Sequence, residues 1–261
     1  MRLAGLLVAL ALLPGCSTNP ITGRDQILAL PAVQAAHANV SFALSSGPQG
    51  IGASPACEQG CGSAGDAAGF PGRVARIGVR LELSAREMAP DLFERIGKFQ
   101  IEMNDAIGVG TGSSAGGRIV LGAGLAGLEP TDAVIAFLIA REMAHVIARH
   151  AEEDSGASIV FSALGMLLPG VNFIARFVAS RLGSSVLAGS WAAKQQSEAD
   201  EIAMQLLEQA GLRARTVALE LDIGINHARL PDGEWATRYL ESARRAEGIA
   251  ASPPRYAAIG E

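Results

Sequence analysis

Charged residues are scarce in this sequence, and it contains no run of Lys or Arg. Asp, Glu, Lys and Arg make up 18% of the 261 residues, and the formal net charge is −5. An acidic balance without a basic run argues against nucleic acid as the main partner. The apolar share of 49% excludes a wholly disordered chain. The length suits one domain with a tail or a small second lobe.

The first apolar run, residues 3–12, is too short to cross a hydrocarbon core of about 30 Å as a helix. It follows the cationic start Met1-Arg2, as the apolar region of a signal peptide does, and the sequence Leu-Pro-Gly-Cys closes it at Cys16. A small residue directly before Cys resembles the lipobox of bacterial lipoproteins. The alternative is a free Cys after an ordinary signal or anchor helix.

The lipobox resemblance has three implications. Residues 1–15 are a signal peptide, and a lipidated Cys16 anchors the mature chain stably in a membrane. Because Ser17 and not Asp follows the cysteine, we expect an outer-membrane lipoprotein that faces the periplasm.

Cys57 and Cys61 lie in a segment rich in Gly, Ala, Pro and Ser. That composition predicts a flexible linker over residues 45–72. Because an exported compartment is oxidising, we expect the two thiols to form a local disulfide, with a redox or metal role as the alternative. The chain therefore divides into the signal peptide, a lipidated and flexible part over residues 16–72, and a folded domain over residues 73–261.

Apolar spacing predicts a mainly α domain with a small β-sheet, an α+β fold. Steps of three and four from Val74 onward favour a helix that breaks at Pro90, although residues 77–83 also alternate as a strand would. Alternation predicts a short strand at residues 99–103, and residues 119–121 suit its partner across a Gly-rich turn.

Further helices follow the predicted sheet. A start signal at residues 130–132 opens a helix that should run to about residue 152, buried on all sides in its first part. Residues 157–175 carry no charge and contain a central Pro-Gly, which favours a buried or membrane-resting helical hairpin over a membrane span. Residues 194–209 and the part up to about residue 247 are predicted as helices.

The buried helix carries the sequence Arg-Glu-Met-Ala-His over residues 141–145. With His in place of Arg141 it would be the zinc motif H-E-x-x-H. Positions i and i+4 share one helical face, so two imidazoles can bind one Zn²⁺ while the Glu acts as general base on a bound water. Of the motif's three defining residues, only Glu142 and His145 are present in this sequence.

Several further motifs carry a resemblance to a family of zinc metallopeptidases. The family includes the CAAX prenyl protease, heat-shock protease X and the periplasmic β-barrel-assembly-enhancing protease. The matching stretches are Asn-Pro-Ile-Thr-Gly-Arg at residues 19–24, Asn-Asp-Ala at 104–106, Gly-Arg-Ile-Val at 117–120, the helix wording at 142–150 and Gln-Ser-Glu-Ala-Asp at 196–200. The resemblance implies a gluzincin-like metallopeptidase domain of the lipoprotein branch, with a degenerate site.

The differences from the family fall on the metal ligands. The family binds zinc through both His of H-E-x-x-H and the first Glu of E-x-x-A-D, and those positions hold Arg141, His145 and Gln196 here. Arg offers no lone pair, and a neutral amide is a poor zinc ligand beside a carboxylate. We therefore expect no cofactor and an idle Glu142, and zinc only in a rearranged site, for which Glu142, His145 and Asp200 are candidates.

The net charge of the site is the same in the family and here. In the family, Zn²⁺ and one carboxylate sum to +1, and here the guanidinium of Arg141 and the neutral amide of Gln196 also sum to +1. We expect Arg141 to take the metal's electrostatic place, paired with Glu142, Glu198 or Asp200 and hydrogen-bonded to Gln196. The alternative is that Arg141 points to solvent. His150 follows His145 by five positions, about 140° further round a helix, and is expected outside the site.

Three functions are consistent with these features. The first is a pseudoenzyme of envelope protein quality control that binds exported or misfolded polypeptides, including outer-membrane proteins, through an edge strand near Ile119. The second is an active zinc-dependent metalloendopeptidase with a rearranged site. The third is a purely structural envelope lipoprotein.

Overall fold

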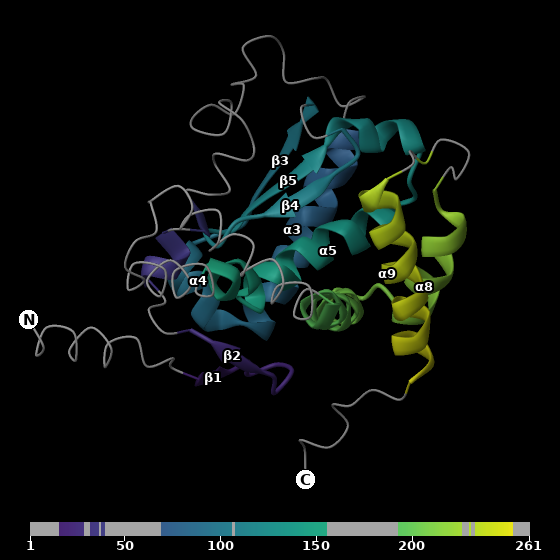
Figure 1. Cartoon of the computed structure of the whole chain (residues 1–261). Helices are drawn as coiled ribbons and strands as arrows, with labels where there is room; N and C mark the ends of the chain where they lie inside the picture. The colour runs from purple at the N-terminus through teal and green to yellow at the C-terminus, as the bar shows by residue number, and fades with distance from the viewer. Residues whose placement is uncertain are drawn as a thin grey trace, which may run out of the picture.

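A computed structural model describes residues 16–28, 32–36, 38–39, 69–105, 108–155, 193–225, 230 and 233–252 (Figure 1). It confirms a mainly helical α+β fold with small sheets. Residues 1–15, predicted as a signal peptide, the Cys57–Cys61 pair, predicted as a disulfide, and the uncharged stretch 157–175, predicted as a helical hairpin, lie outside the described residues. Within the described ranges, no helix combines the length and apolarity needed to cross a membrane.

Two helices open the domain. α3 (Phe70–Met88) and α4 (Pro90–Ile96) meet at Ala89, so the predicted break at Pro90 is confirmed. In α3, Ile77 and Leu81 are buried, whereas Val79 and Leu83 are 66% and 62% exposed. Alternating residues of a strand would share one face, so this burial pattern decides the ambiguous stretch in favour of a helix.

A three-stranded sheet follows, with β3 (Gln100–Asn104), β4 (Thr111–Ser113) and β5 (Arg118–Gly122) in the order β3-β5-β4. β5 pairs parallel with β3 and antiparallel with β4. The predicted pairing of residues 119–121 with the first strand is present, but it is parallel, because β4 intervenes in the chain. Ile119 is fully buried in the central strand, so the predicted edge strand near Ile119 is wrong. β4 is an edge strand instead.

The short 3₁₀ helix η4 (Ala123–Leu128) leads into the central helix α5 (Asp132–Ile147). Thr131 caps α5 by accepting a hydrogen bond from the backbone N–H of Val134 at 3.4 Å, and the first part of α5 is buried all round, as predicted. The helix does not run unbroken to residue 152. Arg149 adopts a positive φ of 59°, and helical geometry resumes only over residues 150–155.

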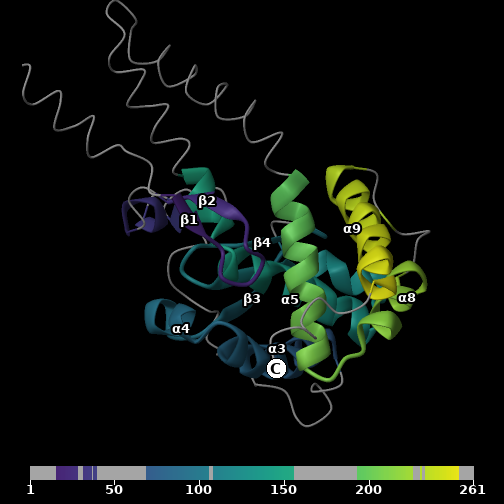
Figure 2. The same ribbon diagram turned by 90° about the horizontal axis from the view of Figure 1, so that it is seen from below.

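Three further helices lie in the described part of the chain after residue 192. The helix over residues 193–209 ends before Gly211, whose φ of 75° suits a helix stop, and this confirms the predicted end. α8 (Ala214–Ile223) and α9 (Glu234–Ala251) then pack side by side (Figure 1, Figure 2). The Tyr239 hydroxyl on α9 donates a hydrogen bond of 2.6 Å to the Leu221 carbonyl on α8.

The N-terminal described residues belong to the folded unit. β1 (Cys16–Thr18) and β2 (Asp25–Ile27) form an antiparallel hairpin beside the helix over residues 193–209 (Figure 2). Asn19 and Gln26 are 1% and 3% exposed, and the Gln26 amide donates to the Ala148 carbonyl just after α5. The expectation of a flexible segment before residue 73 therefore does not hold for residues 16–28.

Candidate functional site

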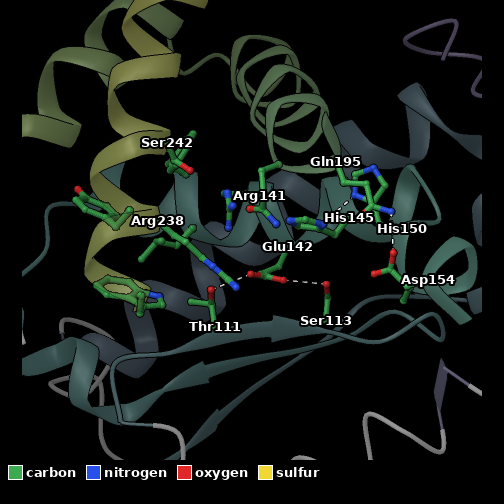
Figure 3. Close-up of a pocket in the computed structure, with 16 residues that line it drawn as sticks. Thr111, Ser113, Arg141, Glu142, His145, His150, Asp154, Gln195, Arg238 and Ser242 are labelled. Carbon is green, nitrogen blue, oxygen red and sulfur yellow. Dashed lines mark hydrogen bonds between the residues drawn. The ribbon is translucent and has the colours of Figure 1, made fainter. Parts of the chain in front are cut away.

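A pocket of about 350 Å³ lies between α5, β4 and α9. Figure 3 shows Arg141, Glu142 and His145 of α5 along it, with Thr111 and Ser113 of β4 below them. Residues 150–154 and 195–196 close one end, and α9 closes the other. The helical spacing thus brings the degenerate zinc motif to a cavity, as the sequence pattern requires.

Glu142 is held by two hydroxyl groups of the edge strand β4. Thr111 donates to its Oε1 and Ser113 to its Oε2, each at 2.8 Å, and the residue is only 5% exposed (Figure 3). Both hydroxyls reach Glu142 because residues i and i+2 of a strand share one face. The carboxylate at the general-base position is therefore bound to protein donors.

Arg141 forms an ion pair with a fully buried carboxylate. Its Nε donates to Asp200 Oδ1 at 2.8 Å, and Arg245 Nε of α9 donates to Asp200 Oδ2 at 2.6 Å. The Arg141 side chain is 11% exposed and that of Asp200 is 0% exposed. Of the three carboxylates expected as partners, Asp200 is thus the one that Arg141 contacts, and Arg141 does not point to solvent.

The predicted hydrogen bond between Arg141 and Gln196 is absent. Among the described residues, the buried Gln196 Oε1 has no hydrogen-bond partner, and neither has Arg141 Nη2. The reason is that Asp200 lies one helical turn beyond Gln196 and, as an anion, takes the guanidinium.

Glu198 binds the N-terminal segment and does not pair with Arg141. Its side chain accepts hydrogen bonds from Asn19 Nδ2 at 2.8 Å and from the Thr22 hydroxyl and Arg24 Nε. Burial alone would raise the pKa of Glu198, but the hydrogen bonds from His150, Thr22 and Arg24 outweigh it and lower that pKa. Glu198 is therefore an ionised anchor for residues 19–24.

Arg24 links the same segment to a second buried carboxylate. Its two terminal nitrogens donate to both oxygens of Glu153 at 3.0 and 2.7 Å, while its Nε contacts Glu198. Burial works against the charge of Arg24, yet the two carboxylates raise its pKa above the ordinary value. The Asn-Pro-Ile-Thr-Gly-Arg motif thus has a structural role that the sequence did not assign.

His150 lies inside the site, which corrects the expectation that it lies outside. Its Nδ1 is 2.8 Å from His145 Nδ1, and its Nε2 is 2.9 Å from Glu198 Oε2. The 140° extrapolation assumed an unbroken helix, and the left-handed conformation of Arg149 turns the chain so that His150 faces back to α5. His150 is only 2% exposed.

His145 is kept neutral by its surroundings. Burial lowers its pKa well below the ordinary value, and the positive charges of Arg141 and Arg238 and the neighbouring His150 lower it further. The 2.8 Å contact between the two Nδ1 atoms requires one ring to donate and the other to accept, and the tautomers of the two rings fix which does which.

Several functional residues carried no signal in the sequence. Thr111, Ser113, Arg238, Ser242 and Trp235 line the pocket, but none lies in a recognisable motif. Arg245 reaches Asp200 from α9 across 45 positions of sequence. Cys16 opens β1, and its side chain is not among those described.

Comparison with known proteins gives the family. The model of peptidase family M48 matches residues 98–239, more than half of the chain, including the three-stranded sheet of β3, β4 and β5, α5 and the helix with Asp200. The chain belongs to peptidase family M48. This family of zinc metallopeptidases is the one that the motifs indicated. Neither the search of curated proteins nor that of solved structures gave a match.

The donor set of this M48 site does not fit zinc. Of the three family ligand positions only His145 offers a strong donor, since Arg141 has no lone pair and Gln196 offers a neutral amide oxygen. The candidate rearranged site does not form either, because Arg141 and Arg245 hold Asp200 while two hydroxyls hold Glu142. Across the described ranges, no three His, Cys, Asp or Glu residues are grouped to hold a metal ion.

Proposed function

We propose that this protein is a non-catalytic M48 lipoprotein of the bacterial envelope that binds exported or misfolded polypeptides in protein quality control. The supporting observation is the ion pair between Arg141 and the buried Asp200, 2.8 Å long, beside the pocket. A guanidinium at a zinc-ligand position can neither coordinate a metal nor activate water. The pocket beside this ion pair does not depend on a metal, so a polypeptide chain can bind there without one.

The edge strand β4 offers the means of binding. Ser114 N–H donates to the Arg118 carbonyl and Gly122 N–H to the Gly110 carbonyl, so the even-numbered residues of β4 face β5. By the alternation of an antiparallel ladder, the N–H and C=O groups of Thr111 and Ser113 point to the outer edge. An extended polypeptide can add there as a further strand, which requires no zinc.

The loss of catalysis is tested by restoring the ligands. We expect the purified protein to contain well below one equivalent of zinc and to leave casein intact. The double variant Arg141→His with Gln196→Glu restores all three ligand types and should bind about one equivalent of zinc. Zinc at one equivalent in the wild type, with casein cleavage lost in Glu142→Gln, would instead establish an active endopeptidase.

Polypeptide binding is tested at β4. Unfolded outer-membrane proteins should cross-link to the wild type, and Ser113→Pro should weaken their binding because Pro lacks the outward N–H. Ser113→Ala removes the same hydroxyl but keeps the N–H, and it should bind at least about tenfold more tightly than Ser113→Pro. Absence of any cross-link in the wild type would favour a purely structural lipoprotein.

The anchor is tested separately. We expect the mature N-terminal peptide to begin at an acylated Cys16, which mass spectrometry detects, and the wild type to fractionate with outer membranes. Cys16→Ser should release the protein from the membrane fraction. An unmodified Cys16 in the wild type would refute the lipoprotein assignment without affecting the binding proposal.

A further inference from the structure

Arg24 joins the two chain segments that form one end of the pocket. Its terminal nitrogens donate to both oxygens of Glu153 at 3.0 and 2.7 Å, and its Nε donates to Glu198 Oε2. Glu153 belongs to the segment 150–155 and Glu198 to the helix over residues 193–209, and both segments contribute side chains to the pocket lining. Arg24 itself does not line the pocket, so it acts on the pocket from outside.

One chain of contacts leads from Arg24 through Glu198 to the pocket wall. Glu198 Oε2, which Arg24 contacts, is 2.9 Å from His150 Nε2. His150 Nδ1 is in turn 2.8 Å from His145 Nδ1. Both imidazole rings line the pocket (Figure 3), so the contacts of Glu198 with Arg24 help to determine how the two rings lie.

A second chain of contacts leads from Arg24 through Glu153. The amide nitrogen of Gln195 is 3.2 Å from Glu153 Oε2 and 3.0 Å from Asp154 Oδ1. Gln195 and Asp154 both line the pocket, at the same end as the two imidazole rings (Figure 3). One guanidinium group is therefore connected to this end of the pocket wall by two separate routes.

The two carboxylates that Arg24 contacts need its positive charge. The side chains of Glu153 and Glu198 are 0% and 3% exposed, and two buried carboxylates beside each other repel when no cation lies between them. The segment 150–155 is not held by an unbroken α5 either, because Arg149 just before it has a positive φ of 59°. Loss of the Arg24 contacts should therefore move the two segments apart and change the shape of this end of the pocket.

We propose that residues 19–24, with Arg24 as their central contact, are positioning residues for polypeptide binding. A chain binds tightly in the pocket only while this segment is docked on Glu153 and Glu198. The inference rests on the polypeptide binding proposed above and adds its regulation. Because β1 joins Cys16 to the segment, the proposed anchor and the pocket are linked through these contacts. Coupling free energy is reciprocal, so a bound polypeptide must stabilise the docked segment by the same factor.

The first test uses the wild-type protein alone. The Gly23 amide donates to the Asn19 carbonyl at 2.8 Å, and so short a turn is not stable when undocked, so its hydrogen exchange measures undocking. A saturating peptide from a strand of an outer-membrane β-barrel protein should slow that exchange at least about fivefold. The control is the Gly211 amide, which donates to the Glu208 carbonyl at the far end of the helix over residues 193–209. Unchanged exchange at Gly23, or equal slowing at Gly211, would overturn the proposal.

Variants test the same coupling through the affinity for that peptide. In fluorescence anisotropy, full-length Arg24→Gln should bind the labelled peptide at least about fivefold more weakly than the wild type, because it loses both ion pairs. Arg24→Lys keeps the charge but offers one nitrogen in place of three, so its affinity should lie between the two. Wild-type affinity in a folded Arg24→Gln would contradict the coupling.

Thr22 offers a milder pair of variants in case Arg24→Gln does not fold. Its hydroxyl donates to Glu198 Oε1, so Thr22→Val should weaken peptide binding, and Thr22→Ser, which keeps a hydroxyl, should restore most of the affinity. Thr18→Val is the matched control with unchanged affinity, because the Thr18 hydroxyl donates to Asp25 at 3.3 Å at an exposed position of the same hairpin. Thr22→Val with the affinity of the wild type would overturn the assignment.

The outcomes separate this inference from the proposed function. If the peptide binds and its binding is weakened by Ser113→Pro, while Arg24→Gln and the exchange at Gly23 show no effect, the proposed function stands and this inference fails. If the peptide does not bind to the wild type, both fail.

Discussion

His145 and His150 face each other through their Nδ1 atoms at 2.8 Å, and Glu198 fixes the far side of His150 at 2.9 Å. The two rings meet edge to face, with centroids 4.9 Å apart. Because Glu198 also binds Asn19, Thr22 and Arg24, one chain of contacts runs from the N-terminal segment to the pocket. His145 is therefore oriented, through His150 and Glu198, by contacts with residues 19–24.

Stability should fall as the pH falls below about 6.5, the ordinary pKa of His. The pKa of His145 is lowered in the folded protein, so between the two values the unfolded chain binds more protons and the free energy of unfolding rises with pH. One such group gives a slope of up to about 1.4 kcal/mol per pH unit. Thermal melts from pH 7.5 to 5.5 measure it.

His145→Gln is the control for that slope, because the Gln amide can hydrogen-bond with His150 without titrating. Its melting temperature should vary less between pH 7.5 and 5.5 than that of the wild type, and equal variation would contradict the assignment to His145.

Glu198 affects the stability at lower pH. Its lowered pKa contributes stability above about 4.5 that is lost as the pH falls through the folded-state value.

Removal of Arg24 should destabilise the domain although the residue lies outside the matched family region. Arg24 pairs with Glu153 and Glu198, whose side chains are 0% and 3% exposed, so Arg24→Ala leaves two buried carboxylates without their cation. We expect a loss of about 2–4 kcal/mol in urea unfolding, somewhat less than the ~3–5 kcal/mol of a fully buried broken pair, because Arg24 keeps 20% exposure.

The matched control is Arg76→Ala. Arg76 and Asp132 are both more than half exposed and lie 3.5 Å apart, so its removal should cost less than about 1 kcal/mol. If Arg24→Ala unfolds like Arg76→Ala, residues 19–24 do not form part of the stable domain.

Close backbone packing at the end of β5 predicts a sharp contrast between two glycines. A Cβ on Gly122 would lie 1.9 Å from the Gly108 carbonyl oxygen, which belongs to the backbone and cannot rotate away, so Gly122→Ala should cost about 3 kcal/mol or more. A Cβ on Gly248 in α9 would meet no atom within 4 Å, so Gly248→Ala should stabilise by up to about 1 kcal/mol. Urea unfolding measures both, and similar effects would contradict the packing at β5.

The helices could be predicted because apolar steps of three and four persist over many residues, as from Val74 through α3. β4 could not, because Thr-Gly-Ser is three residues long and has no apolar alternation. If β4 is not recognised, a Gly-rich stretch between two short strands indicates a hairpin. Only the complete sheet shows that β3 and β5 pair in parallel and that Ile119 lies in the central strand.

The site was predictable to the extent that it lies on one regular helix. The spacing of Arg141, Glu142 and His145 places them on α5 without further information. His150 was misplaced because Arg149 takes a positive φ that no nearby Gly or Pro signals. The contacts that determine the chemistry, such as Arg245 with Asp200 and Thr111 with Glu142, join elements far apart in the chain and depend on tertiary packing.

A double-mutant cycle tests whether the charge of Arg141 is compensated by Asp200 or whether the two side chains contribute no interaction energy. Arg141→Met keeps much of the side chain's volume and Asp200→Asn keeps its shape, so the cycle isolates their interaction, which we expect to exceed about 1.5 kcal/mol for a buried, hydrogen-bonded pair. Arg245 also holds Asp200, and therefore Arg141→Met alone should cost less than Asp200→Asn. The pair Arg86 and Glu82, four residues apart on α3 with side chains 42% and 22% exposed, should give only about 0.3–0.5 kcal/mol in the same cycle. A coupling between Arg141 and Asp200 as small as that of the surface pair would mean that the guanidinium does not hold the place of the metal, and the account of the site as an internally balanced pseudopeptidase would have to be given up.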